Sequence, residues 1–348
     1  MKKPTMQDIA DALSTSRVTV WKALNGRPGV SDALREEIRN KAQQMGYFAA
    51  EAEPPRRQTV AAVVSRPESS AFWIEIIHQL AKELSDRNIN LLYTYLPAVY
   101  EKGYTLPTAL RDGSVSGLLV LNVYSEQLLR MLAGLPLPKV FLDTMPAVPF
   151  GQLDGNLVML EGRCLVREIT GRLLRSGRTR LGFIGDIRYA QTNMDRYEGF
   201  LDAHREAGLM PDPALSLTGP LGLYTHHAEI GDFLRGLNSL PDGFVCASDY
   251  IAHFVQANFT EHELDPGQRV VLTGFDNNAE YTNVAGRITT VDVQTETLGA
   301  RLANDLLFVT AHPEASKELI YVNSEILYRG SWLQTPSCNK LNQKTSLL

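Results

Sequence analysis

Apolar residues recur at helical spacing in three short segments near the start of the chain. Their apolar faces consist of Met6, Ile9, Ala10 and Leu13, then Val20, Ala23 and Leu24, then Leu34, Ile38, Ala42 and Met45. Thr5, Ser16 and Ser31 precede these segments and have side chains that cap helices, and Gly46 can end the third one. The pattern predicts three short helices around a thin core in residues 1–48, with the third over 32–45.

The outward face of the second predicted helix consists of Arg17, Val18, Trp21, Lys22 and Asn25. An apolar back with cations and donors in front is typical of a helix that enters a nucleic-acid groove, so the first two helices predict a helix-turn-helix. Residues on this helix that suit base edges are Arg17, Lys22 and Val18, and those that suit phosphates are Ser16, Thr19 and Asn25. For Trp21 two alternatives stay open: contact with the sugar-phosphate wall, or cover of the small core.

From residue 59 short apolar runs alternate with amphipathic segments. We predict strands over 59–65, 89–96, 115–122, 138–143, 180–186, 243–248 and 269–276. Helices are predicted over 72–88, 125–133, 158–176, 195–208, 225–238, 249–261 and 295–310. Such alternation predicts an α/β body of parallel, doubly wound sheets covered by helices on both faces. Ligands of such sheets lie beyond the carboxyl ends of the strands.

Between these parts, residues 49–58 lack periodicity and contain Pro54-Pro55, which predicts a linker. The polar residues 337–348 predict a loose tail. The chain therefore divides into a head (1–48), a linker (49–58) and a body (59–336).

Charge is distributed unevenly along the chain. The net charge is -5, yet residues 1–57 hold ten Lys/Arg against seven Asp/Glu, whereas the other 291 residues hold 24 against 32. A small basic head on an acidic body is expected if only the head contacts phosphate.

Several classes of function lack their sequence signals. No apolar run is long enough to span a membrane and no signal peptide is evident, so we expect a cytoplasmic protein. Cys164, Cys246 and Cys338 are too widely spaced for a zinc site and predict buried thiols, and His226-His227 predicts a solvated pair. No nucleotide-binding glycine loop, metalloprotease motif or nucleophile elbow is present. We therefore expect no enzyme, no cofactor and no metal.

Polar residues gather where the predicted strands end. Asp143, Ser248, Asp249 and Asp276 follow strands, Arg196 lies near a helix start, and Phe72 and Trp73 follow the first strand. For Asp249 we favour a helix-capping role over ligand contact, and Phe72 and Trp73 are either a cleft wall or helix core. Carboxylates, one Arg and aromatic walls together suit a sugar or nucleoside.

The chain resembles the lac repressor (LacI/GalR) family of bacterial regulators. The resemblance rests on TMQDIADALSTSRVTVWKALNG, VSDALREEIRNKAQQMGY, FLD, DRYEGF, CASDYIA, LTGFDN and ITTVDVQTETLGARLANDLL, in the order and spacing of the family, over residues 4–333. It implies a helix-turn-helix head on a periplasmic-binding-protein-like body. In this body the chain crosses between two subdomains near 151–157, 285–290 and 319–324. The N-subdomain would span about 59–154 and 289–320, and the C-subdomain about 155–288 and 321–336.

The resemblance also implies partners and sites. It implies a homodimer on a near-palindromic operator, and the tail shows no leucine heptad that would favour a tetramer. The residues expected to contact DNA are Thr5, Ser16, Arg17, Val18, Thr19, Trp21, Lys22, Asn25 and Tyr47. Those expected to line the effector cleft are Phe72, Trp73, Asp143, Thr192, Arg196, Ser248, Asp249 and Asp276.

Four positions depart from the family pattern. Ser14 replaces a glycine in the helix-turn-helix, which predicts a left-handed backbone there. Trp21 replaces a small hydroxyl residue, and Ser248 replaces an Asn that often precedes the Asp. Residues 49–57, AAEAEPPRR, lack the leucine that wedges into the minor groove, so we expect no hinge helix and no central kink.

The resulting hypothesis is a DNA-binding transcriptional regulator, a repressor, gated by a small polar effector, a sugar rather than a purine. The alternatives are a solute-binding protein without a regulatory role, which the basic head disfavours, and an enzyme with Asp143 and Asp276 as paired carboxylates.

Overall fold

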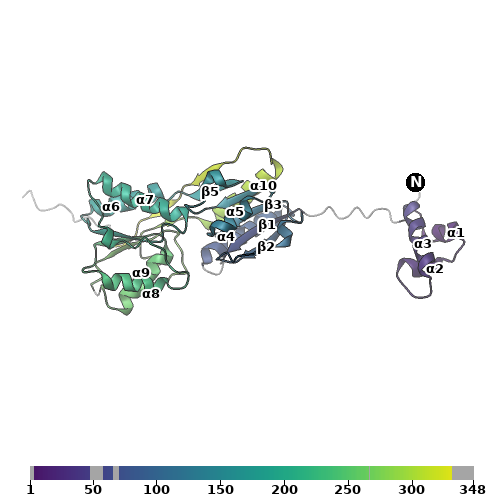
Figure 1. Ribbon diagram of the computed structural model, residues 1–348, viewed down its shortest axis with the longest axis horizontal. Coiled ribbons are helices and arrows are strands. Elements are labelled where there is room, and N and C mark those ends of the chain that lie inside the picture. The colour runs from purple at the N-terminus through teal and green to yellow at the C-terminus, as the bar shows by residue number, and fades with distance from the viewer. Residues whose placement is uncertain (1–3, 48–57, 66–69, 266, 331–348) are drawn as a thin grey trace, which may run out of the picture. The chain divides into compact units, whose positions relative to one another are not determined.

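The chain folds as two compact units, residues 1–57 and 58–348, shown in the computed structural model of Figure 1. The structure describes residues 4–47, 58–65, 70–265 and 267–330. Most of the predicted linker, the predicted tail and Cys338 lie outside these residues, and so does the expectation about the hinge helix.

The first unit is a bundle of three helices, α1 (Met6–Ala12), α2 (Arg17–Leu24) and α3 (Asp32–Gln44). Thr5 caps α1 in a reciprocal capping box with Asp8, while Ser16 and Ser31 cap α2 and α3. The fully buried core contains Ile9, Ala10, Val20, Ala23, Ile38 and Ala42. Ser14 has a φ of +49°, as predicted for the position of the missing glycine.

The second unit contains a six-stranded parallel sheet in the order β10-β5-β4-β3-β1-β2. Its strands are β1 (Thr59–Ser65), β2 (Asn90–Leu96), β3 (Gly117–Leu121), β4 (Lys139–Leu142), β5 (Asn156–Leu160) and β10 (Leu319–Val322). In β1, Val60, Ala62 and Val64 point into one core and Ala61 and Val63 into another. Because strand side chains alternate between faces, this sheet has a core on each side.

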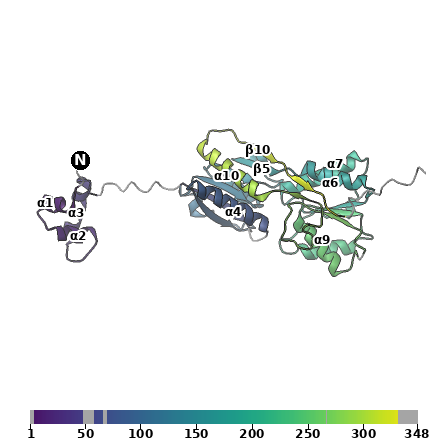
Figure 2. The ribbon, with the colours of Figure 1, turned by 180° about the vertical axis from the view of Figure 1, so that it is seen from behind.

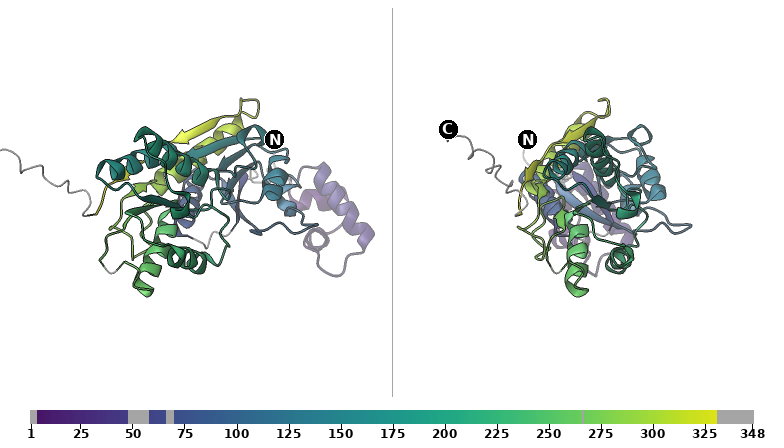
Figure 3. Two further views of the ribbon diagram at one scale, coloured as in Figure 1. Left: turned by 60° about the vertical axis from the view of Figure 1, so that its left-hand side comes forward. Right: turned by 90° about the vertical axis from the view of Figure 1, so that its left-hand side faces the viewer.

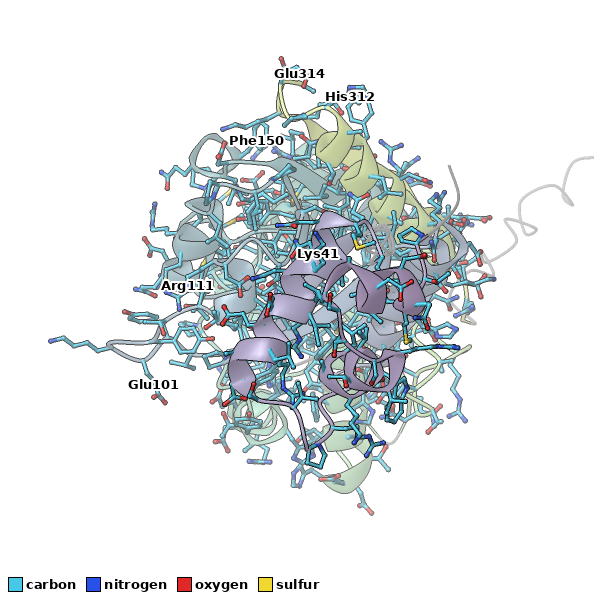
Figure 4. All side chains as sticks on the ribbon, turned by 90° about the vertical axis from the view of Figure 1, so that its right-hand side faces the viewer. Lys41, Glu101, Arg111, Phe150, His312 and Glu314 are labelled. Carbon is cyan, nitrogen blue, oxygen red and sulfur yellow. The ribbon has the colours of Figure 1, made fainter. Side chains whose placement is uncertain are left out.

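Helices cover both faces of this sheet. Helix α4 (Ala71–Asp86) and helix α10 (Thr295–Ala311) pack against each other on one face of the sheet. Both helices are labelled in Figure 2, which views the molecule from behind. Helix α5 (Glu126–Ala133) covers the other face. Beyond the end of α10, His312 and Glu314 lie in the loop that leads to β10 (Figure 4).

A second sheet has the parallel strands β6 (Leu181–Ile184), β7 (Gly243–Cys246) and β8 (Val271–Thr273) in that order. Single bridges extend it to β9 (Thr290–Asp292), which pairs antiparallel with β11 (Glu325–Leu327). Helices α6 (Arg163–Arg175) and α7 (Gln191–Glu206) lie on one face, and α8 (His226–Gly236) and α9 (Asp249–Glu261) on the other (Figure 3). Three short 3-10 helices complete the described elements, at Thr108–Leu110, Phe150–Gln152 and Pro213–Leu215.

The two sheets define two lobes, between which the chain passes three times. The first passage follows β5, the second follows β9, and the third joins β10 to β11. Two predicted positions therefore need correction. The predicted first crossing, 151–157, overlaps β5, which belongs to the first lobe. The predicted second crossing, 285–290, ends at the start of β9, which belongs to the second lobe. These two crossings therefore come after residues 160 and 292. The predicted third crossing, 319–324, contains the observed one.

Three other predictions are wrong. Residues 158–176 are not one helix, because β5 occupies 156–160 and α6 begins at Arg163. Helix α7 begins at Gln191 rather than at 195. Cys164 is exposed, whereas Cys246 is buried as predicted. Within the described part of the chain, no helix is long and apolar enough to cross a membrane.

Candidate functional site

The outward face of α2 is exposed as the sequence predicts. Val18 keeps 61% of its surface and Trp21 44%, while Val20 and Ala23 on the opposite face are fully buried. The Ser16 and Thr19 hydroxyls lie 2.8 Å apart at the start of the helix. A capped, well-packed helix therefore presents Arg17, Val18, Trp21 and Lys22 to solvent on a rigid support.

Three other predicted DNA contacts have roles within the head itself. The Asn25 side-chain amide donates to the Trp21 carbonyl oxygen at 2.9 Å. Thr5 is occupied by its capping box with Asp8, and Tyr47 packs against the small core after α3. Their contacts with DNA stay a prediction. For Trp21, the alternative of core cover is disfavoured, because its ring lies outside the head's core cluster.

The body has a cleft between its lobes, at the carboxyl ends of strands from both sheets. It holds about 1110 Å³ of empty space, counted out to its open mouth. Seven of the eight predicted effector residues line it: Phe72, Trp73, Asp143, Thr192, Arg196, Ser248 and Asp276. Small-molecule sites favour such positions, where a parallel sheet leaves a crevice beyond its strands.

Asp143 connects the lobes across this cleft. It follows β4 in the first lobe, has a φ of +65°, and is buried. Its carboxylate accepts hydrogen bonds from the Thr192 hydroxyl at 2.7 Å, the Thr192 backbone N–H at 3.3 Å and the Thr144 backbone N–H at 2.7 Å. The Tyr124 hydroxyl donates a fourth bond at 2.9 Å. Burial nevertheless raises the pKa of Asp143 above its ordinary value.

A second group of contacts crosses between the lobes at the start of α4. The Asn278 side-chain amide donates to the Ser70 hydroxyl at 2.9 Å, and the Ala71 backbone N–H donates to Glu280 at 2.9 Å. In each of these two bonds the donor and the acceptor belong to different lobes, as in the bond between Thr192 and Asp143. The described arrangement is therefore one in which polar bonds hold the lobes together on both sides of the cleft.

Arg196 and Asp276 face each other in the cleft with hydrogen-bonding groups that the protein leaves unused. Arg196 is buried, donates to the Ala247 carbonyl oxygen at 2.6 Å and lies over the Phe275 ring at 3.6 Å. Its Nε has no hydrogen-bond partner, and its Nη2 is 3.7 Å from Asp276 Oδ1, too far for a hydrogen bond. Burial raises the pKa of Asp276 to about 7, although Arg196 opposes this shift. The pair thus offers unused donors beside an unused acceptor.

Asp249 is not among the residues that line the cleft, and the prediction that it caps α9 is wrong. The cap is Ser248, whose hydroxyl accepts from the Ile251 N–H, and Asp249 is the first helical residue. Its buried carboxylate accepts from the Thr290 hydroxyl at 2.8 Å and the Asn278 N–H at 2.9 Å, and burial raises its pKa to about 6. Asp249 therefore ties α9 to the loop after β8, beneath the cleft.

Aromatic side chains form the cleft walls, and most were not predicted. Tyr124 and Tyr189, from different lobes, have ring centroids 4.5 Å apart. Further cleft residues are Tyr250, Tyr281 and His226, joined by ring contacts of 5.3 and 5.6 Å. His226 also stacks on Phe254, and His227 lies 3.0 Å from Glu261. The prediction of a solvated histidine pair fits His227, whose side chain is 42% exposed, but is wrong for His226, which lines the cleft. Phe72 and Trp73 line the cleft, although Phe72 is also core.

Comparison with known proteins agrees with this architecture. A profile of periplasmic binding protein-like domains matches residues 170–332. The chain is 24% identical over 343 residues to the HTH-type transcriptional regulator RegA of Clostridium saccharobutylicum, covering 94% of this chain and 98% of RegA. It is 25% identical to the HTH-type transcriptional regulator CelR of Thermobifida fusca, covering 88% of this chain and 92% of CelR.

Solved structures share the fold over nearly the whole chain. A complex of the regulator CelR with cellobiose has a TM-score of 0.65 at 21% identity and covers 94% of this chain and 99% of that one. A lac repressor dimer bound to operator and the anti-inducer ONPF has a TM-score of 0.65 at 17% identity, covering 95% and 99%.

The chain is similar along nearly its whole length to regulators of the lac repressor family. Full-length similarity to regulators extends through the helical head as well as the cleft-bearing body, which a solute-binding protein alone would not explain. The predictions of a helix-turn-helix head, of a parallel α/β body and of a transcriptional regulator are confirmed. No comparison tests the individual site residues, which stay predictions placed by the geometry above.

Proposed function

We propose that the chain is a member of the lac repressor family, and that it is a cytoplasmic repressor whose affinity for operator DNA is set by a neutral, polyhydroxylated effector in the cleft. The observation that supports this most directly is the Arg196–Asp276 pair. Guanidinium donors without partners lie beside a carboxylate without a donor, and a hydroxyl group can accept from one and donate to the other.

The other cleft walls favour a sugar over a purine. Sugars present hydroxyls at their edges and C–H faces above and below, which suits polar groups between aromatic rings such as Tyr250 and Tyr281. A cleft with the carboxylates of Asp143, Asp186 and Asp276 against one Arg also disfavours an anionic ligand. The relative CelR was solved with the disaccharide cellobiose.

The same geometry supports a mechanism of population shift. A ligand that contacts Arg196 in one lobe and Asn122 or Trp73 in the other favours one relative orientation of the lobes. The lobe-to-lobe bonds of Asp143 and Ser70 belong to that orientation. We propose no catalytic step, because the carboxylates of Asp143 and Asp249 are engaged by protein donors and Asp276 faces Arg196.

We also propose a homodimer, formed by the edge of the first sheet at β2 and the adjacent helix α4. Ile74, Tyr93 and Tyr95 keep 55%, 46% and 53% of their surfaces exposed there. Large exposed apolar side chains grouped at a sheet edge are typical of interfaces. A lac repressor of the same fold was solved as a dimer on its operator. Two symmetric heads would then bind two half-sites together.

Gel retardation of the chain's own promoter region by the full-length protein tests the regulatory part of the proposal. We expect specific retardation that changes on addition of one neutral sugar from a panel that includes cellobiose. Arg196→Lys should abolish the response to the sugar, whereas Arg205→Lys, on the exposed side of the same helix α7, should preserve it. No specific retardation in any condition would refute the DNA-binding function, and turnover of the sugar would indicate an enzyme.

Sedimentation of full-length variants tests the dimer. Tyr95→Asp on β2 should give a monomer that binds DNA weakly. Tyr321→Asp is the matched control, because Tyr321 is 52% exposed on β10, at the opposite edge of the same sheet. If the two variants sediment as the same oligomer, the proposed interface at β2 is refuted.

A further inference from the structure

The exposed indole of Trp21 on α2 has a cationic neighbour, Arg27. The guanidinium carbon of Arg27 lies 6.0 Å from the centroid of the Trp21 ring. Contacts of this kind between a cation and the face of a tryptophan are attractive at such distances. Since 44% of Trp21 remains exposed, the ring supports Arg27 without being buried by it.

The turn after α2 fixes the position of Arg27. Gly26 has a φ of +66°, which reverses the chain, and the Arg27 backbone N–H then donates to the Lys22 carbonyl oxygen at 2.9 Å. Arg35, on α3, donates to the Arg27 carbonyl oxygen at 3.0 Å and to the Ala23 carbonyl oxygen at 3.3 Å. The backbone that bears Arg27 is thus tied to both α2 and α3, and the cation is not on a free loop.

The surroundings of Arg27 are cationic. No acidic residue occurs between Ser16 and Ser31, and Arg17 and Lys22 lie on the same exposed side of α2. Arg27 is itself exposed, and no ion pair engages it among residues 4–47. A cation held in place beside other cations, in a segment without acidic residues, suits a surface that meets an anion.

We propose that Trp21 and Arg27 form a phosphate clamp, in which Trp21 is a positioning residue that orients the Arg27 guanidinium toward one DNA phosphate. The clamp rests on the DNA-binding function of the head. Arg27 follows the end of α2, outside the face that enters the groove, so its reach is to the wall of the groove rather than to base edges. Arg17 and Lys22 remain the residues that contact bases, and the clamp fixes how α2 lies between the strands.

The salt dependence of DNA binding by the full-length chain tests this clamp. The probe is a 40-base-pair duplex selected from a random library with the wild-type protein. Loss of one phosphate contact lowers the slope of log K against log salt by about 0.9. The ratio of the wild-type binding constant to that of Arg27→Gln should therefore fall about 3.5-fold between 50 and 200 mM salt. Arg39→Gln, an exposed charge change on α3, should leave the slope unaltered.

Trp21 variants separate positioning from simple packing. Trp21→Ala should reduce the slope as Arg27→Gln does, and the double variant should lose little more than either single one. Trp21→Phe, which keeps a ring for the guanidinium, should retain most of the slope. An unchanged slope in Arg27→Gln overturns the proposal, and so does a change of base preference in a repeated selection, since that would indicate a base contact. Failure of the wild type to select any duplex would instead refute the DNA-binding function.

Discussion

Replacement of Thr192 by valine should weaken the closed arrangement of the lobes. The Thr192 hydroxyl donates to Asp143 Oδ2 at 2.7 Å, and both residues are no more than 6% exposed. Valine has nearly the same shape but no donor, so this carboxylate oxygen would keep only the Tyr124 hydroxyl. Loss of one hydrogen bond to a buried carboxylate costs about 1–3 kcal/mol.

The cost falls on the lobe-to-lobe contact, because Asp143 and Thr192 belong to different lobes. If the effector binds the closed arrangement, its affinity should fall by the corresponding factor of about 5–150. Titration of the full-length variant with the sugar that alters DNA binding measures this factor, and urea unfolding measures the loss of stability.

Thr260→Val is the matched control, because the Thr260 hydroxyl is exposed and donates only to the Gln256 carbonyl oxygen of its own helix, α9. It should change neither quantity appreciably. If Thr192→Val binds the sugar and unfolds as Thr260→Val does, the bond to Asp143 makes no net contribution and the account of the closed arrangement fails.

Because burial raises the pKa of Asp276 to about 7, a sugar that donates to its carboxylate should bind more tightly as pH rises from 5 to 7 and release a proton. Calorimetry in two buffers checks this, and Asp276→Asn should remove the dependence. Gly274→Ala would drive a methyl group into Asp249 Oδ1 and should cost about 1–3 kcal/mol in thermal unfolding, whereas Gly151→Ala, with open space around it, should not. Ser16→Ala removes the cap of α2 and should cost the head about 1 kcal/mol and lower its DNA affinity in parallel, as circular dichroism and retardation would show.

Local signals in the sequence located the elements whose ends are set by local chemistry. The caps of α1, α2 and α3 are Thr5, Ser16 and Ser31, because a hydroxyl three residues before an amide satisfies it whatever the rest of the chain does. Likewise Asp143 and Asp276 lie in the cleft because they follow strands of parallel sheets, whose carboxyl ends share one edge.

Positions decided by distant partners could not be predicted in this way. Ser248 and Asp249 are both good caps, and the choice is made by Thr290 and Asn278, which hold the Asp249 carboxylate from far along the chain. The sequence does not separate strand β5 from α6, because a strand buried on both faces has no alternation that distinguishes it from helix. Gly162, between the two elements, was the available signal for the break.

The aromatic walls of the cleft were missed for a similar reason. Tyr124 and Tyr189 lie in loops, where no periodicity indicates direction, and Tyr250 lies in the first turn of α9. Whether such a ring faces the core or the cleft depends on how the lobes meet. That relation is a property of the tertiary structure and not of any single segment.

The third passage between the lobes has a consequence for the order of folding. Strand β10 pairs with β5 at the edge of the first sheet, and β11 pairs with β9 beside the second. Residues 319–327 thus complete both sheets at once, although the other strands of the first sheet lie within residues 59–160. On the ribosome the helical head, whose contacts are local, can fold early. Neither lobe of the body can close its sheet until nearly all of the chain has been synthesised.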